Sequence, residues 1–142
     1  MKLLLKTFVV LLVLPVWVAA QDDDEWPSLS YLRSDYKAVS VVVHIRIKEA
    51  EITSRIIGYE NWRIRAEVLE SFKGKFKKGD AIEYLHGAEA GFSQKYFTGE
   101  KIVFLLAERD KARRLQYVVL ENSTLSYEEH RVKKLRVIRG RR

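Results

Sequence analysis

The alternation of β-branched residues with other residues along 39–47 is the feature that most restricts how this chain can fold. Every second residue there is β-branched, and the five fall on one face of a strand: Val39, Val41, Val43, Ile45 and Ile47. Such a face favours burial, because each of these side chains contributes about 1.5–3 kcal/mol of transfer free energy when it is buried. The sequence therefore predicts a first strand that is long enough to bend across two sides of a small barrel.

Four further segments predict strands, separated by turns that contain glycine or several polar residues. They are residues 62–72, 81–85, 102–107 and 115–120. The alternation slips at residues 68–70, which predicts a β-bulge near the end of the second strand. Residues 102–107 are apolar on both faces, so we expect them to form the most buried strand. Residues 53–61 and 87–99 lack periodicity and are predicted to be loops.

Both ends of the predicted barrel carry helix signals. Pro27 suits the first position of a short helix that continues to Leu32. Near the other end, Ser126 would cap a helix in which apolar residues recur at three-residue spacing up to Ile138. A sixth strand over residues 131–138 fits the same pattern nearly as well.

Together these signals predict an all-β fold, a small OB-like five-stranded barrel with a short N-terminal helix and a C-terminal helix or arm. The predicted divisions are a signal peptide (1–20), an acidic lead and short helix (21–34), the barrel (35–122), and a C-terminal helix or arm with a basic tail (123–142). The 122 residues after the predicted signal peptide are enough for one domain with one core.

The first twenty residues have the three parts of a secretory signal peptide. Lys2 and Lys6 provide the positive region, residues 8–14 are continuously apolar, and residues 18–20 are small enough for signal peptidase. The apolar run is shorter than the about 20 residues that a membrane-spanning helix needs. The sequence predicts export to the periplasm or the extracellular space, with no transmembrane segment in the mature chain. The alternative is an uncleaved N-terminal anchor.

Basic charge is concentrated in one short segment. The chain has 26 Lys and Arg against 19 Asp and Glu, and seven of the cations lie among the last twelve residues. Without these seven and the two lysines of the signal peptide, 17 basic residues face 19 acidic ones. The tail, with Arg139, Arg141 and Arg142 as candidate contact residues, is predicted to be a solvated end, to bind an anionic envelope component, or to bind acidic residues such as 22–25.

Short motifs occur in a distinctive order along the predicted barrel: Asp35, Ala38-Val39, Lys73-Gly74, Lys78-Gly79-Asp80 and Gly99-Glu100. This order resembles the netrin-like, tissue-inhibitor-of-metalloproteinase-like OB barrels found in many bacterial exported proteins. The resemblance covers about half of the chain, and it implies a barrel fold and an exported protein. Metalloproteinase inhibitors of this fold begin with a cysteine that chelates the protease zinc. This chain has no cysteine, so the resemblance transfers no functional residue.

The residues that could carry catalysis do not form a recognisable constellation in the sequence. His44, His86 and His130 lie far apart and lack the spacing of a metal-binding motif. There is no thiol, no glycine-flanked nucleophilic serine and no glycine-rich phosphate loop. The sequence predicts a protein that is not an enzyme and has no cofactor and no metal site. The alternative is a small exported hydrolase or metal-dependent enzyme that uses His44 or His86.

A nucleic-acid-binding OB fold is a further alternative. Arg63 and Arg65 are predicted to lie on the outer face of the second strand, with Tyr84 on the third, and such barrels bind single strands through cations and stacked aromatic rings. Three acidic residues are interleaved with them: Glu67, Glu70 and Glu83. These carboxylates would weaken a phosphate groove, and an exported protein meets little nucleic acid, so no nucleic-acid partner is expected.

The function that these observations favour is a non-enzymatic binding module of the cell envelope or extracellular space. Its partner is predicted to be a protein or an anionic envelope component. The long loop over 87–99 is the candidate contact surface, because long loops on rigid scaffolds often carry function. The candidate contact residues in it are Phe92, Tyr96 and Phe97. The alternative is that these three aromatic rings plug the end of the barrel.

Overall fold

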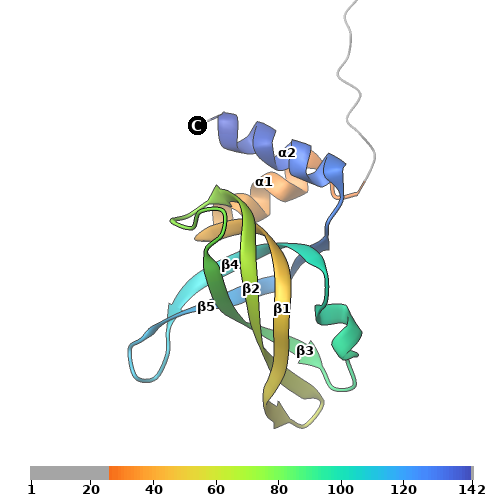
Figure 1. The fold of residues 1–142 in the computed structure, drawn as a ribbon, viewed down its shortest axis with the longest axis vertical. Helices are drawn as coiled ribbons and strands as arrows, with labels where there is room; N and C mark the ends of the chain where they lie inside the picture. Colours follow the sequence, from red (N-terminus) through yellow and green to blue (C-terminus); the bar gives the residue numbers. More distant parts are fainter. Residues whose placement is uncertain (1–25, 142) are drawn as a thin grey trace, which may run out of the picture.

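The computed structural model of this protein describes residues 26–141, apart from the side chains of Glu121 and Asn122. The predicted signal peptide, the acidic residues 22–25 and Arg142 lie outside the described residues. Figure 1 shows the described part as a barrel of strands with two helices together at one end. Within this part, neither helix has the length and the apolar composition that crossing a membrane requires.

The elements follow one another in the order α1 (Leu29–Ala38), β1 (Val41–Ile56), β2 (Tyr59–Lys73), β3 (Ala81–Glu89), the 3-10 helix η1 (Gln94–Phe97), β4 (Glu100–Arg109), β5 (Leu115–Ser126) and α2 (Glu129–Gly140). The strands close into a barrel in the order β1-β2-β3-β5-β4, and β4 pairs with β1. All neighbours are antiparallel except β3 and β5, which are parallel and meet at one registered pair, Leu85 with Val118. The predicted OB-like five-stranded barrel is confirmed.

Two apolar cores stabilise the fold. The first fills the barrel and contains Val43 and Ile45 of β1. The second lies between the outer surface of the barrel and the two helices, and it contains Val42, Phe104 and Leu135. The alternation places Val42 on the outer face of its strand, yet its side chain is fully buried because the helices cover that part of the barrel.

β4 is apolar on both faces because one face lies inside the barrel and the other lies beneath the helices. Ile102 and Phe104 belong to the core beneath the helices, while Val103 and Leu105 belong to the core inside the barrel. All four side chains are fully buried, which agrees with the prediction for this strand. Two apolar residues of the predicted strands are only partly buried and pack against the cores: Leu106 and Val119.

Helix α1 is longer than the sequence predicts. It continues to Ala38 instead of ending near Leu32, so the predicted boundary after residue 34 falls inside the helix. Tyr36 lies one turn beyond Leu32, is buried, and donates a hydrogen bond from its hydroxyl to the Phe72 carbonyl at 2.6 Å. This contact with β2 favours the helical conformation, because tertiary packing overrides weak local propensity.

Residues 53–61 form the outer part of a long β-hairpin and are not the predicted loop. β1 and β2 both continue into this segment and leave a two-residue turn, in which Gly58 has a φ of +78°. A cross-strand ion pair supports the hairpin, with Arg55 Nε 3.1 Å from Glu60 Oε1. The segment has no apolar alternation because it extends beyond the core, and residues 53–59 are all exposed.

A β-bulge interrupts β2 where the alternation slips, as predicted. His44 pairs with Glu70 and Ile45 pairs with Val68, which leaves Leu69 without a partner in the ladder. Bulges of this kind increase the local bend and twist of a strand. The bend helps the β1–β2 pair to wrap around the small barrel.

The C-terminal segment is a helix, α2, and not a sixth strand or an extended arm. β5 continues to Ser126, so the predicted boundary after residue 122 falls inside a strand. Ser126 therefore does not cap α2, and Glu128 takes the N-cap position without a side-chain cap bond. Leu135 and Ile138 bury the inner face of α2 in the core beneath the helices.

Candidate functional site

The candidate contact surface lies at the end of the barrel away from the two helices, and we call it the η1 end. Three segments form it: the β1–β2 turn (56–59), the last part of β3 (85–89) and the connection from β3 to β4 (90–99). The Gly58 carbonyl accepts a hydrogen bond from the Ala90 backbone N at 3.0 Å, which ties the turn to the connection. In Figure 1 this end lies below the barrel centre, and the helices lie above it.

The three aromatic residues predicted in this connection have different environments. Phe97 is buried in the barrel core, and its ring centroid lies 4.7 Å from that of Trp62. Tyr96 is partly buried and packs edge-on against both Phe97 and Phe92. Phe92 is exposed. Phe97 therefore closes the barrel end, while Phe92 remains available for contact.

A pocket of about 350 Å³ opens beside these rings. Tyr59, Phe92 and Tyr96 provide aromatic walls, and the Tyr59 ring lies across Gly87, where an added Cβ would come within 3.1 Å of it. His86 and Thr124 also line the pocket, and His86 Nδ1 and Thr124 Oγ1 are buried without a hydrogen-bond partner among the described residues. Both residues therefore add polar side chains to a pocket whose other walls are mainly aromatic.

His86 is held neutral in this environment. Burial of the imidazole lowers the pKa of His86 to about 4, because the charged form loses hydration. Its neighbours are the rings of Tyr96 and Phe97, which offer no negative charge to stabilise an imidazolium. At neutral pH the pocket therefore presents an uncharged imidazole beside a hydroxyl.

The depressed pKa of His86 predicts a loss of stability in mild acid. Between about pH 6.5, the usual pKa of unfolded histidine, and pH 4, the unfolded chain binds a proton at His86 that the folded protein does not. We expect the free energy of unfolding to fall across this interval by at most about 3 kcal/mol, with no contribution from His86 above it. The measurement is urea denaturation at a series of pH values for the wild type and His86→Phe. The prediction is contradicted if the free energy of unfolding changes with pH in the same way for both proteins between pH 6.5 and 4.5.

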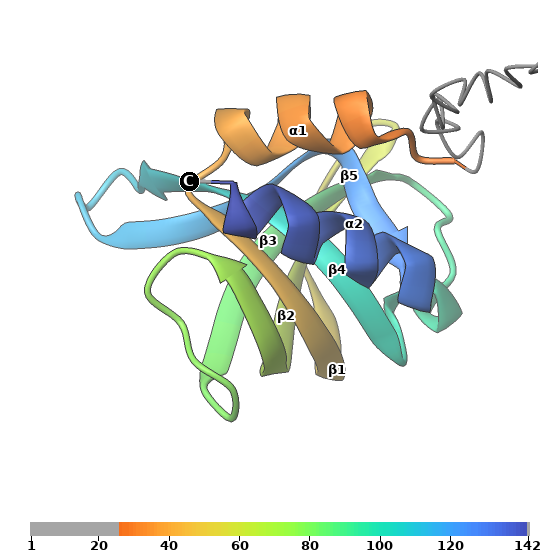
Figure 2. The same ribbon diagram turned by 90° about the horizontal axis from the view of Figure 1, so that it is seen from above.

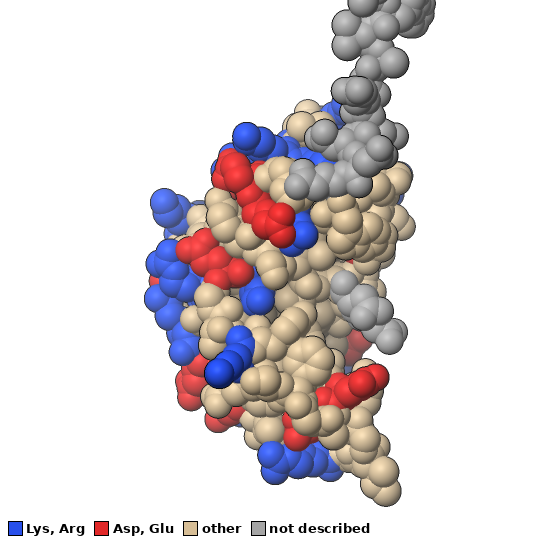
Figure 3. Space-filling view, turned by 90° about the vertical axis from the view of Figure 1, so that its right-hand side faces the viewer, with Lys and Arg blue, Asp and Glu red and all other residues tan. Residues whose placement is uncertain are grey.

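Exposed apolar side chains surround the pocket. Ile57 is fully exposed at the tip of the β1–β2 hairpin, and its neighbours Ile56 and Tyr59 are exposed as well. Tyr59 and Phe92 line the pocket together, so the hairpin tip and the connection share one surface. Figure 3 views the side of the molecule on which η1 lies, where residues other than Lys, Arg, Asp and Glu cover much of the surface between charged groups at the left and at the lower end. Grouped apolar side chains of this kind are typical of interaction sites.

The outer face of β1, β2 and β3 has the position at which OB folds commonly bind nucleic acid. Arg63 Nη1 lies 3.0 Å from Glu51 Oε1, while Arg65 lies 2.8 Å from Glu49 and 3.0 Å from Glu83. Three carboxylates thus neutralise two guanidinium groups. Tyr84, predicted to accompany them, is buried inside the barrel and cannot stack on a base there. Arg63 and Arg65 are thus not free cations, and Tyr84 is not an exposed ring, so these three described residues do not form the surface that single-strand binding uses.

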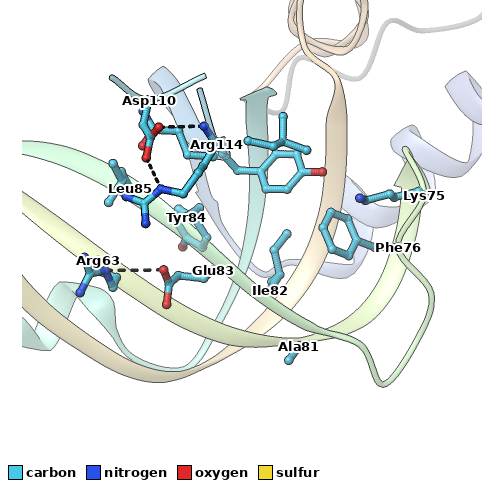
Figure 4. Close-up of a pocket in the computed structure, with 13 residues that line it drawn as sticks. Arg63, Lys75, Phe76, Ala81, Ile82, Glu83, Tyr84, Leu85, Asp110 and Arg114 are labelled. Carbon is cyan, nitrogen blue, oxygen red and sulfur yellow. Dashed lines mark hydrogen bonds and ion pairs between the residues drawn. The ribbon is translucent and has the colours of Figure 1, made fainter. Parts of the chain in front are cut away.

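A second cavity, of about 590 Å³, lies at the seam where β3 and β5 separate on either side of their single registered pair. Figure 4 shows Arg63 paired with Glu83 on one side of the cavity and Arg114 paired with Asp110 on the other. Lys75 lies over the ring of its neighbour Phe76, 6.0 Å from the ring centre. Because most of its charges are satisfied within the wall, this cavity is a weaker candidate than the pocket at the η1 end.

The two histidines of the enzyme alternative lie in unrelated surroundings. His44 Nε2 is 2.9 Å from Glu100 Oε2, and the His44 ring stacks on Tyr127 beside the helix end of β1. His86 lies in the pocket at the η1 end. Within residues 26–141, no three His, Asp or Glu side chains converge in a way that would hold a metal ion.

The predicted tail residues are placed differently from one another. Arg139 is tied to the barrel, with Nη1 3.1 Å from the Ser71 carbonyl and 3.6 Å from Glu70 Oε1. Arg141 follows α2 and lines a separate pocket beside Lys37. Arg142 lies outside the described residues. The basic segment is therefore largely part of a docked helix.

Sequence reasoning missed the contribution of the β1–β2 hairpin to the η1 end. The missing periodicity of residues 53–61 predicts a loop, and it does not mark Ile56, Ile57 or Tyr59 as contact residues. Two consecutive isoleucines before a glycine in an otherwise polar segment were the available signal. Comparison with known proteins finds neither a family model nor a curated protein that matches this chain.

Proposed function

We propose that this protein is an exported, non-enzymatic binding module that holds a protein partner at the η1 end of its barrel. The observation that carries the proposal is the group of exposed apolar residues around the pocket: Ile56, Ile57, Tyr59 and Phe92. A rigid closed barrel presents them, and exposed patches of this kind cost free energy unless a partner covers them. The likeness of the turn motifs to netrin-like exported domains supports the same role.

The pocket favours an aromatic side chain with a polar group, such as tyrosine or tryptophan, as the part of the partner that enters. Its walls are aromatic, and aromatic pairs in tilted or edge-on geometry are more stable than area alone predicts. His86 and Thr124 line the pocket with polar side chains, which suits an aromatic group that carries a hydroxyl or an indole N–H. Residues of this type are those that most often fill interface pockets.

Export rests on the predicted signal peptide, residues 1–20. Cleavage after Ala20 would begin the mature chain at Gln21, which is followed by the acidic residues 22–25. A barrel without cysteine can function in an oxidising compartment without forming disulfides. Mass spectrometry of the protein recovered from culture medium or periplasm tests this part: a mature N-terminus at Gln21 is expected.

Crosslinking the tagged protein in its native envelope tests the contact surface. We expect Phe92→Ala and Ile57→Asp each to reduce the recovered partner at least tenfold, because loss of a central anchor commonly costs about 2 kcal/mol or more. The matched control is Leu115→Ala, which removes an exposed apolar side chain at the start of β5.

The comparison between the variants decides the outcome. Partner recovery that depends on Phe92 and Ile57 but not on Leu115 supports the η1 end as the binding surface. Recovery that is equal for all three variants contradicts it, provided that each variant has the melting temperature of the wild type within a few degrees. Because these side chains are exposed, their replacement leaves the core unchanged.

A further inference from the structure

A pocket of about 440 Å³ lies between the helices and the end of β2, on the side of the molecule away from the η1 end. Six residues line it: Arg33, Tyr36, Lys37, Lys73, Ile138 and Arg141. Four of them are cations and none is acidic. Figure 2 shows why they meet, because the C-terminal ends of α1 and α2 lie on the same side of the barrel.

The cations in this pocket differ in what they contact. Lys73 Nζ donates hydrogen bonds to the carbonyls of Tyr36 and Val39, at 2.6 and 2.5 Å, and so caps the end of α1. No ion pair or side-chain hydrogen bond joins Arg33, Lys37 or Arg141 to any other residue within the described part of the chain. Three cationic side chains are thus available to a ligand.

The neighbouring cations of α2 provide the contrast. Arg136 Nη2 lies 2.8 Å from Glu70 Oε2, and this hydrogen bond holds the pKa of Glu70 below its usual range. Arg139 lies 3.6 Å from the same carboxylate. The face of α2 that meets β2 therefore has a matching acid, whereas no acidic residue lines the pocket among those that the structure describes.

Interaction with the C-terminal ends of the helices does not account for all of the positive charge that lines this pocket. The C-terminal end of each helix carries a partial charge of roughly −0.5, which the cations partly offset. Leaving Lys73 aside, Arg33, Lys37 and Arg141 against two such ends leave roughly +2 at the pocket. Arg33 and Lys37 also stand one turn apart on α1, an arrangement of like charges that weakens a helix. An anion in the pocket would remove both sources of repulsion.

We infer that this pocket binds a phosphate group, either of a soluble phosphate compound or of an anionic lipid headgroup. Two guanidinium groups can each form paired hydrogen bonds with phosphate oxygens, which favours phosphate over a small monovalent anion. Buried Tyr36 and Ile138 give the pocket an apolar floor. Its volume lies in the range of pockets that hold a small organic ligand, so it has room for a phosphorylated headgroup. The η1 end would remain free for a protein partner.

Two probes separate the sources of the phosphate. Calorimetric titration with inorganic phosphate measures binding of the free group, and cosedimentation with phosphatidylglycerol vesicles, compared with phosphatidylcholine vesicles, measures binding to a headgroup. The variant is Arg33→Ala/Lys37→Ala. The control is Lys77→Ala/Lys78→Ala, which removes the same charge from exposed positions in the β2–β3 turn.

We expect the Arg33→Ala/Lys37→Ala protein to bind about 30-fold more weakly than the wild type to whichever probe binds, and the control to change by about threefold or less. The melting temperature of the Arg33→Ala/Lys37→Ala protein should equal or exceed that of the wild type, because this variant lacks the like-charge pair on α1. Binding to phosphate that depends on the pocket supports a soluble ligand. Binding only to phosphatidylglycerol, again dependent on the pocket, supports a headgroup. Binding to neither probe, or equal losses in variant and control, overturns the inference.

Discussion

Phe97→Ala is expected to lower the free energy of unfolding by about 3–5 kcal/mol, the usual cost of emptying a buried phenylalanine site. The Phe97 side chain is buried at the end of the barrel and packs against Trp62, so its removal leaves a cavity that the closed sheet can fill only in part. Urea denaturation monitored by tryptophan fluorescence measures the loss. A change smaller than about 1 kcal/mol would show that Phe97 does not close the barrel.

Phe92→Ala is the matched control, five positions away in the same connection. Its ring is exposed and touches Tyr96 and Phe97 from outside, so we expect a change of about 1 kcal/mol or less. The pair separates two interpretations of the aromatic connection, a plug and a contact surface, which the structure divides between the two residues. Equal, large losses for both variants would assign the whole cluster to the plug.

Leu135→Ala is expected to cost about 2–5 kcal/mol, because Leu135 is fully buried between α2 and the barrel. The matched control is Val137→Ala on the same helix, where the side chain is exposed and the expected change is about 0.5 kcal/mol or less. Thermal and urea denaturation of the two variants provide the measurement. The comparison tests whether α2 is an integral part of the fold.

An unchanged melting temperature for Leu135→Ala would contradict the prediction that α2 is an integral part of the fold. If Leu135→Ala melts like the wild type, the C-terminal segment is an arm whose docking adds nothing to stability. That result would also remove Arg141 from a fixed position beside Lys37, and the phosphate pocket would lose one wall. A large loss at Leu135 with none at Val137 supports a docked helix that positions the pocket.

Much of the barrel could be predicted because its signals are local. β-branched residues at every second position identify β1, and the apolar run over Ile102–Leu105 identifies β4. The slip near Leu69 locates the bulge, since a break in a period of two is visible in the residues themselves. Glycines such as Gly74 and Gly79, both with positive φ, mark the turn between β2 and β3.

The candidate sites depended on contacts that no local pattern contains. Phe92 and Phe97 have the same residue type, and only the packing against Trp62 decides which is buried. The phosphate pocket joins Arg33 to Arg141, which are distant in the sequence and meet because the two helices end on the same side.

The sequence by itself determined the presence and order of the five strands, the bulge and the turn between β2 and β3, because the period of side chains along a strand and the backbone freedom of glycine act over a few residues. It did not determine the lengths of β1, β2 and β5, which continue past the predicted segments. The tertiary structure alone decided the length of α1, the second core and the burial of Val42. Ser123 donates a hydrogen bond to Asp35 at 2.6 Å, across 88 positions of the chain. Contacts of this kind form only when the barrel has closed and both helices lie against it.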